Sequence, residues 1–270
     1  MAERLITATG IEVTYGNRRR GGVKVLHGVD LHLDRGETIG IVGESGSGKT
    51  TLGRALIRLV DTSAGEIRFD GKDITHLGEE AMRPYRKRMQ MIFQDPMASL
   101  NPRHSIRQIL AGPLLFHGLA KSEAEADQRI AKMLDRVGLP SIVLQRNPHE
   151  LSGGQRQRIG IARAALLEPE FVLADEIVSG LDVSTQAQVL NLLKDLCRDL
   201  GLAMAFISHD LSVIRAVCDR VYVMRQGRVE EAGDCATLFD DPQSAYTREL
   251  LDAIPLPEVD ADWLKDPEVA

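Results

Sequence analysis

The apolar residues of this chain follow two patterns, one typical of buried strands and one typical of amphipathic helices. Almost continuous apolar runs occupy residues 38–42, 89–93, 171–174 and 203–207, as expected for strands that are covered on both faces. The spacing i, i+3, i+4, i+7 follows the first of these runs, at Leu52, Ala55, Leu56 and Leu59. A second helical face lies at Val189, Leu193, Leu196 and Leu200. The two patterns together predict an α/β fold with a mixed or parallel sheet.

The N-terminal part of the chain indicates a sheet of another kind. Residues 5–8 and 11–15 are short strand-like segments, and residues 25–33 alternate apolar with polar positions. Residues 65–71 form a further short strand bounded by glycines. These segments predict an N-terminal antiparallel, half-buried β-subdomain. The turn 16–22 carries an arginine run, which either binds phosphate or an acidic surface, or is a solvated loop.

The middle of the chain interrupts this alternation with helical periodicity. Residues 122–125 form a capping-box pattern, and a helical apolar face follows at Ile130, Met133, Leu134 and Val137. Gly138 and Pro140 predict the end of that helix. We therefore expect an α-helical subdomain, roughly residues 104–166, to be inserted into the α/β domain.

Composition excludes several classes of function. With 270 residues and a formal net charge of −6, the chain gives no support to broad nucleic-acid binding. The sequence contains no run of eighteen apolar residues, so no membrane span is predicted. The N-terminus lacks the apolar core of a signal peptide. Cys197, Cys218 and Cys235 have no metal-ligand spacing and are expected to be reduced, packed thiols. We expect a soluble, cytosolic globular protein.

One glycine-rich segment carries a specific chemical signal. Residues 43–50 fit the phosphate-loop pattern G-x-x-x-x-G-K-[ST], between the buried strand 38–42 and a predicted helix. Unpaired N–H groups and the helix dipole both favour an anion at such a helix N-terminus. The alternative, an ordinary glycine-rich turn, does not explain this context. The core is therefore predicted to be that of a phosphate-loop (P-loop) NTPase.

Polar groups also follow the other buried runs. Gln94 leaves the run 89–93, the carboxylates Asp175 and Glu176 end the run 171–174, and His209 follows the run 203–207. Two carboxylates at a strand end can hold hydrated Mg²⁺ and orient or deprotonate a water molecule. Each residue taken alone has a plain alternative as a loop residue. Because ligands bind at the carboxyl ends of parallel strands, we expect these groups to meet at one site.

A second set of candidate residues opens two predicted helices. Ser152, Gly153, Gly154 and Gln155 precede an amphipathic helix that is predicted to run to Leu167. They form either a second anion site or an ordinary serine N-cap. Asp182 precedes the next helix and is at least a candidate N-cap.

These motifs together resemble the ATPase subunits of ATP-binding-cassette (ABC) transporters, from about Leu5 to Pro255. The family's own mark is Leu-Ser-Gly-Gly-Gln, here residues 151–155. Within the family, residues 94–103 and 181–190 resemble the dipeptide and oligopeptide importer branch. The resemblance implies an ABC nucleotide-binding domain over residues 1–254 and leaves an acidic C-terminal tail, 255–270.

The resemblance also implies a role for each matched residue. Tyr15 would stack on adenine, Glu176 would be the general base, and His209 would link the attacking water to the γ-phosphate. Lys49 and Gln94 would assist catalysis, and Mg²⁺ would be held by Thr50, Gln94 and Asp175. The residues implied in ATP binding are Tyr15, Gly43, Glu44, Ser45, Gly46, Ser47, Gly48, Lys49, Thr50, Thr51, Ser152, Gly153, Gly154, Gln155 and Asp182.

The implied partners follow from the family's use of one phosphate loop and one signature in trans. A second ABC ATPase subunit, identical or related, would complete the ATP sites, with Asp182 lying across the interface. The implied activity is ATP hydrolysis coupled to uptake of peptides or a related solute through transmembrane permease subunits, served indirectly by a solute-binding protein. The subunit would lie on the cytoplasmic face of the inner membrane. The alternative is a non-transport ABC ATPase with a regulatory or nucleic-acid-associated role, which the acidic balance disfavours.

Four departures from the branch's pattern stand out. Ile177 and Val178 follow Glu176 where a proline is usual, and Gly180 replaces an alanine, so a looser loop is expected. Residues 244–246 read Ser-Ala-Tyr in place of His-Pro-Tyr. The cysteine-containing extension of many such subunits is absent, so we expect no iron–sulfur cluster.

Overall fold

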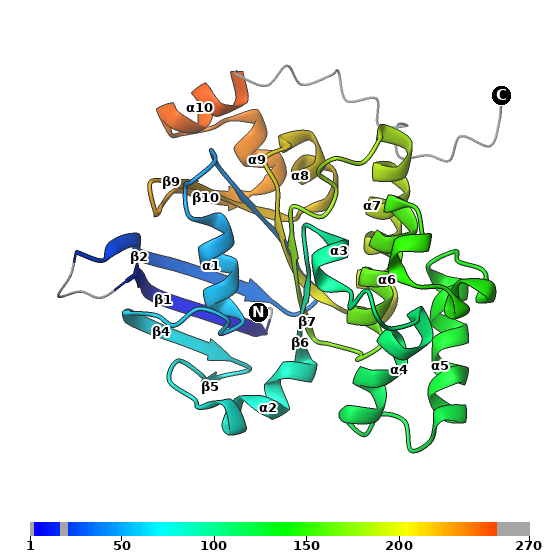
Figure 1. Ribbon diagram of the computed structural model, residues 1–270. Helices are drawn as coiled ribbons and strands as arrows, with labels where there is room; N and C mark the ends of the chain where they lie inside the picture. The colour runs from blue at the N-terminus through cyan, green and yellow to red at the C-terminus, as the bar shows by residue number, and fades with distance from the viewer. Residues whose placement is uncertain (1–2, 17–20, 253–270) are drawn as a thin grey trace.

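Two sheets build the molecule, which we describe from a computed structural model covering residues 3–16 and 21–252. The N-terminal sheet lies on one side and a group of helices on the other, with the larger sheet between them (Figure 1). The arginines 18–20 and the acidic tail 255–270 lie outside the described residues.

The N-terminal sheet has four strands in the order β2-β1-β4-β5 and is antiparallel throughout. Its strands are β1 (Arg4–Tyr15), β2 (Val23–Asp34), β4 (Ala64–Phe69) and β5 (Lys72–Asp73). Alternate side chains of β1 and β2 are buried, because only one face of this sheet is covered. The antiparallel N-terminal subdomain expected from the sequence is confirmed.

The core sheet has six strands in the order β10-β9-β3-β8-β7-β6. Pairings among the five strands from β9 to β6 are parallel, and β10 alone pairs antiparallel with β9. The bounds are β3 (Thr38–Val42), β6 (Met89–Ile92), β7 (Phe171–Asp175), β8 (Ala203–Ile207), β9 (Arg220–Arg225) and β10 (Arg228–Asp234). The mixed sheet predicted from the apolar runs is therefore confirmed.

Helices cover this sheet and fill the chain between β6 and β7. Beside the N-terminal sheet lie α1 (Lys49–Leu56) and α2 (Glu79–Arg88). Between β6 and β7 come α3 (Pro96–Ser99), α4 (Ile106–Phe116), α5 (Glu123–Arg136), the 3₁₀ turns η2 (Ser141–Gln145) and η3 (Pro148–Glu150), and α6 (Gly153–Ala165). The remaining helices are α7 (Val183–Leu200), α8 (Leu211–Val217), α9 (Cys235–Asp240) and α10 (Ala245–Asp252).

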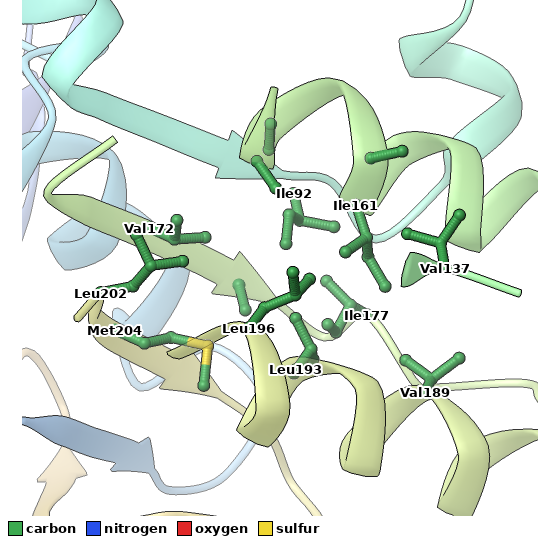
Figure 2. Close-up of a cluster of buried hydrophobic side chains, with 14 of the residues drawn as sticks. Ile92, Val137, Ile161, Val172, Ile177, Val189, Leu193, Leu196, Leu202 and Met204 are labelled. Carbon is green, nitrogen blue, oxygen red and sulfur yellow. The ribbon is translucent and has the colours of Figure 1, made fainter. Parts of the chain in front are cut away.

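Both faces of the core sheet are buried, which explains its continuous apolar runs. Alternate residues of β7 divide between two clusters: Phe171 and Leu173 face the N-terminal sheet and α1, whereas Val172 and Ala174 face α6 and α7. Figure 2 shows the second cluster, in which Val172 and Met204 from the sheet meet Leu193 and Leu196 from α7. The sheet thus lies between two apolar layers, which position its strand ends.

Three local predictions differ from the structure. The segments 5–8 and 11–15 are one strand, β1, with glycine at the left-handed position Gly10. Leu59 is not part of the first helical face: α1 ends at Leu56, Arg58 has a φ of 56°, and Leu59 is 52% exposed. The helix predicted to reach Leu167 ends at Ala165. At α1, the left-handed backbone of Arg58 sets the boundary, and side-chain periodicity does not encode it.

None of the helices in the described parts of the chain is both long enough and apolar enough to cross a membrane.

Candidate functional site

The phosphate loop joins β3 to α1 and is pressed against β9. Gly43 has a φ of 142°, and a Cβ there would meet the carbonyl oxygen of Met224 at 2.1 Å, so only glycine fits. The N–H of Gly227, in the turn between β9 and β10, donates to the carbonyl of Ser47 at 2.9 Å. The β9–β10 hairpin therefore supports the back of the loop.

Lys49, the first residue of α1, is buried inside the loop. Its Nζ donates to the carbonyl oxygens of Gly43 at 2.7 Å and Glu44 at 2.8 Å. Burial lowers the pKa of this ammonium, and the nearby carboxylates of Glu176 and Asp175 act in the opposite direction. The loop thus holds the lysine ammonium by hydrogen bonds to two carbonyls, in a place where it could bind an anion.

Asp175 and Thr50 form a compact oxygen-rich pair beside the lysine. Thr50 Oγ1 donates to Asp175 Oδ1 at 3.1 Å. Burial raises the pKa of Asp175, whereas the Thr50 hydrogen bond lowers it. Among the residues that the structure describes, no group of three or more His, Cys, Asp or Glu side chains could hold a metal ion by itself. A hydroxyl and one carboxylate fit Mg²⁺, which takes one or two protein oxygens and completes its shell with water and phosphate.

Glu176 connects the ends of three strands. Its backbone N–H donates to Ile207 of β8 at 2.9 Å, and its φ is 50°, in the left-handed region. Gln94, which follows β6, donates from Nε2 to Glu176 Oε2 at 3.0 Å. His209, which follows β8, places Nδ1 at 4.0 Å from Glu176 Oε1. The structure therefore brings together the strand-end groups that the sequence singled out.

Tyr15 reaches the same region from the end of β1. Its side chain is 45% exposed, and its hydroxyl lies 3.5 Å from Thr51 Oγ1 at the start of α1. An exposed aromatic ring beside the first turn of α1 has the chemistry for stacking on a flat ligand.

The residues Ser152 to Gln155 and Asp182 lie in a separate pocket of about 530 Å³. Ser152 and Gln155 form a reciprocal capping box: the Ser152 hydroxyl accepts from the Gln155 N–H at 3.3 Å, and Gln155 Oε1 accepts from the Ser152 N–H at 3.1 Å. Asp182 caps α7 by accepting from the Thr185 N–H at 2.9 Å. Hydrogen bonds from Ser184 and Thr185 lower the pKa of Asp182. Gly153 and Gly154 complete this pocket, which none of the strand-end groups lines.

The loop around the departures at 177–180 is anchored. Ile177 and Val178 are buried in the apolar layer between the sheet and α7. Gly180 has a φ of 78°, a conformation in which an alanine would be strained. Burial explains apolar side chains at 177 and 178, and the positive φ explains glycine at 180.

The sequence-based interpretation missed one contact with the phosphate loop. The hydroxyl of Tyr246, on α10, accepts from the Glu44 N–H at 3.4 Å across 202 positions of sequence. The only signal was the departure from the branch pattern at 244–246, which marked the segment without indicating its neighbour.

Comparison with known proteins places these features in a family. The model for ABC transporters matches residues 26–179. A Brucella ovis protein named a peptide import ATP-binding protein is 52% identical over 257 residues, covering 95% of this chain and 80% of the relative. The dipeptide transport ATP-binding protein DppF of Lactococcus lactis is 45% identical over 269 residues, covering 99% of this chain and 86% of that protein. The oligopeptide transport ATP-binding protein OppF of Bacillus subtilis is 48% identical over 242 residues, covering 89% of this chain and 79% of that protein.

Solved structures agree. CbiO1 of Clostridium perfringens, part of the ABC transporter complex CbiONQ, superposes with a TM-score of 0.77 at 28% identity, covering 88% of this chain and 92% of that one. The ATP-binding cassette MJ0796, in a dimeric post-hydrolysis state bound to ADP and Pi, gives a TM-score of 0.78 at 28% identity, covering 86% of this chain and 99% of that one. The chain belongs to the ABC transporter family. It is an ATPase of the ATP-binding-cassette type.

Proposed function

We propose that the chain is the ATP-hydrolysing subunit of an importer for peptides, of the dipeptide or oligopeptide type, or for a related solute. The observation that carries the assignment of ATP hydrolysis is the meeting of Lys49, Asp175, Glu176, Gln94 and His209 at the carboxyl ends of β3, β7, β6 and β8. The peptide-transport names of relatives at 45–52% identity support the choice of solute.

ATP binds along the first turn of α1. Tyr15 stacks on the adenine ring, and the loop amides together with Lys49 hold the phosphates. The contributing residues are Gly43, Glu44, Ser45, Gly46, Ser47, Gly48, Lys49, Thr50 and Thr51.

Mg²⁺ would be held by Thr50, Gln94 and Asp175. When bound, it neutralises charge that develops on the phosphates. The hydrogen bond between the Thr50 hydroxyl and the Asp175 carboxylate, which brings two of these oxygens within 3.1 Å of each other, supports this assignment.

Glu176 is the general base. A water molecule gives a proton to a Glu176 carboxylate oxygen, its oxygen bonds to the γ-phosphorus, and the bond from that phosphorus to the ADP oxygen breaks. Gln94 holds the carboxylate through its 3.0 Å hydrogen bond. His209 contacts the γ-phosphate and the same water, and Lys49 stabilises the phosphate charge.

A second ABC ATPase subunit, identical or related, completes the site. Ser152, Gly153, Gly154 and Gln155 close on ATP held by that partner, and Asp182 lies across the interface. The separation of this pocket from the strand-end cluster within one chain supports the arrangement.

The nucleotide-binding domain comprises residues 1–254, and the helical segment 104–166 contacts transmembrane permease subunits, which receive solute from a solute-binding protein. Mg²⁺-dependent hydrolysis takes place on the cytoplasmic face of the inner membrane. No nucleic acid takes part.

The test is to purify the tagged chain from gently solubilised membranes and to identify its companions by mass. We expect to recover multispanning proteins in either case. A second cassette chain will accompany them if the ATPase pair is a heterodimer, and no other cassette chain if the pair is a homodimer. The purified complex, returned to vesicles, should hydrolyse ATP faster when a peptide-loaded solute-binding protein is added. Recovery of only soluble protein or nucleic acid would contradict the importer and favour the non-transport alternative.

A further inference from the structure

Tyr246 is a buried aromatic residue that the proposed chemistry does not use. It lies in the first turn of α10 and is 3% exposed. The guanidinium of Arg225, at the end of β9, lies 4.6 Å from the centre of its ring. Helices α9 and α10 follow β10 along the chain and lie next to the β9–β10 hairpin (Figure 1). The ring is thus fixed by burial and by a cation–π contact.

The hydroxyl of Tyr246 contacts the peptide unit between Gly43 and Glu44. The N–H of that unit donates to Tyr246 Oη at 3.4 Å. The carbonyl of the same unit accepts from Lys49 Nζ at 2.7 Å. Because a peptide unit is planar, holding its N–H also orients its carbonyl. Tyr246 and Lys49 therefore hold one peptide plane from opposite sides.

Helix α10 is itself tied to the core sheet. Glu231 of β10 accepts from the N–H of Gln243 at 2.8 Å and from the N–H of Ser244 at 3.0 Å. The Ser244 hydroxyl accepts from the N–H of Tyr246 at 3.2 Å. These bonds run from the sheet through the start of α10 to the residue that touches the loop, so the position of Tyr246 is set by β10.

We propose that Tyr246 is a positioning residue for ATP binding, which fixes the Gly43–Glu44 peptide and through it the resting position of Lys49. The inference rests on the ATP site proposed above. It assigns to the C-terminal helix a role in the affinity of the phosphate loop.

Removal of the hydroxyl leaves the Glu44 N–H without this partner. The loop then samples more orientations, and ATP must order it on binding. A net hydrogen bond corresponds to a change of about two- to tenfold in an equilibrium constant. The rate of the chemical step at saturating ATP should change little, because Glu176 is held by contacts to β8 and Gln94, and Lys49 contacts the phosphates instead of the Gly43 carbonyl once ATP is bound.

The test is Tyr246→Phe, which keeps the ring and its contact with Arg225. We expect the Kd and KM for Mg²⁺-ATP to rise about two- to tenfold, while kcat at saturating ATP stays within error and the urea midpoint falls by no more than the loss of one hydrogen bond. Tyr85→Phe, on α2, is the matched control and should change neither constant. Glu231→Gln, which weakens the tie of α10 to β10, should raise KM in the same direction.

An unchanged or lowered KM in Tyr246→Phe would overturn the inference. A loss of kcat and stability together with an unchanged Kd would do the same, because it would indicate only a structural role. Failure of the unaltered chain to bind ATP would instead refute the proposed ATP site, so the two failures are distinguishable.

Discussion

At the scale of single residues, the backbone of Glu176 is the least expected feature of the site. It is one of the non-glycine residues with positive φ, a conformation that costs about 1–2 kcal/mol. This strained residue lies directly after the end of β7, and its backbone conformation directs the carboxylate toward Gln94 and His209. Strain at such a position is typical of functional residues.

Glu176→Gln should leave ATP binding and stability unchanged but lower hydrolysis about 10²- to 10⁴-fold, because the amide cannot accept a proton from water. The measurements are steady-state phosphate release and equilibrium binding of Mg²⁺-ATP. Glu168→Gln is a matched control, since Glu168 is also a left-handed glutamate, with a φ of 50°, and bonds to Arg129 on the surface. Near-normal hydrolysis by Glu176→Gln would exclude the general-base role.

The sequence predicts which residues lie together at the strand ends, but not which contacts and backbone conformations hold them. The strand-end positions of Gln94, Glu176 and His209 follow from apolar runs, because burial on both faces leaves a clear sequence pattern. The contact of Tyr246 with Glu44 joins residues 202 positions apart, and no local pattern encodes such a contact. The left-handed φ of Glu176 is equally invisible in the sequence, since glutamate has no preference for that region.

At the scale of elements, helix starts were predicted well, and helix ends were predicted where a glycine marks them, as at Gly138 just after α5. Ser122 caps α5 as expected, with its hydroxyl accepting from the Glu125 N–H at 3.2 Å. The other half of the predicted box is absent, because the Glu125 carboxylate accepts from the Lys121 N–H at 2.9 Å instead. A cap is a short-range side-chain bond and leaves a sequence signature, whereas the end of α1 near Leu56 depends on a backbone reversal at Arg58.

Ser122 and Ser152 offer a comparison of two similar caps with different surroundings. Either serine replaced by alanine should destabilise the protein by about 1 kcal/mol, through loss of one N-cap bond. Only Ser152→Ala should also lower ATP hydrolysis by the assembled pair, because Ser152 lines the pocket in which we propose that the partner's ATP binds. Urea unfolding and phosphate release separate the two effects. Equal hydrolysis by the two variants would mean that Ser152 is only a cap.

At the scale of the whole molecule, an ionic cluster fastens the two sheets together. Arg35, between β2 and β3, bonds to Glu170 at 2.7 Å and also pairs with Asp70 after β4. Arg88, before β6, bonds to Asp70 at 2.7 Å and also pairs with Glu170. Hydrogen bonds from Arg88 are the largest cause that holds the pKa of Asp70 and of Glu170 below the ordinary values.

This cluster predicts an acid-sensitive contribution to stability. Because the carboxyl pKa values are lower in the folded state, the contribution is complete above the unfolded values, about pH 4, and disappears as the pH falls through the folded values. Glu170→Gln should therefore lower the free energy of unfolding by about 1 kcal/mol at pH 7, with the difference vanishing in acid. Urea titrations across pH measure it. Asp61→Asn, at a side chain that is 94% exposed, is the control; a loss independent of pH in Glu170→Gln would contradict the ionic origin.

The same core strands carry this cluster and the candidate site at opposite ends. Arg35, Arg88 and Glu170 precede β3, β6 and β7, while the phosphate loop, Gln94 and Glu176 follow those strands. For protein engineering, the molecule therefore has two sets of positions at opposite ends of the same strands. Thermal tolerance can be adjusted at the amino ends of the strands, by adding or removing charge, while turnover is left to the residues at the carboxyl ends.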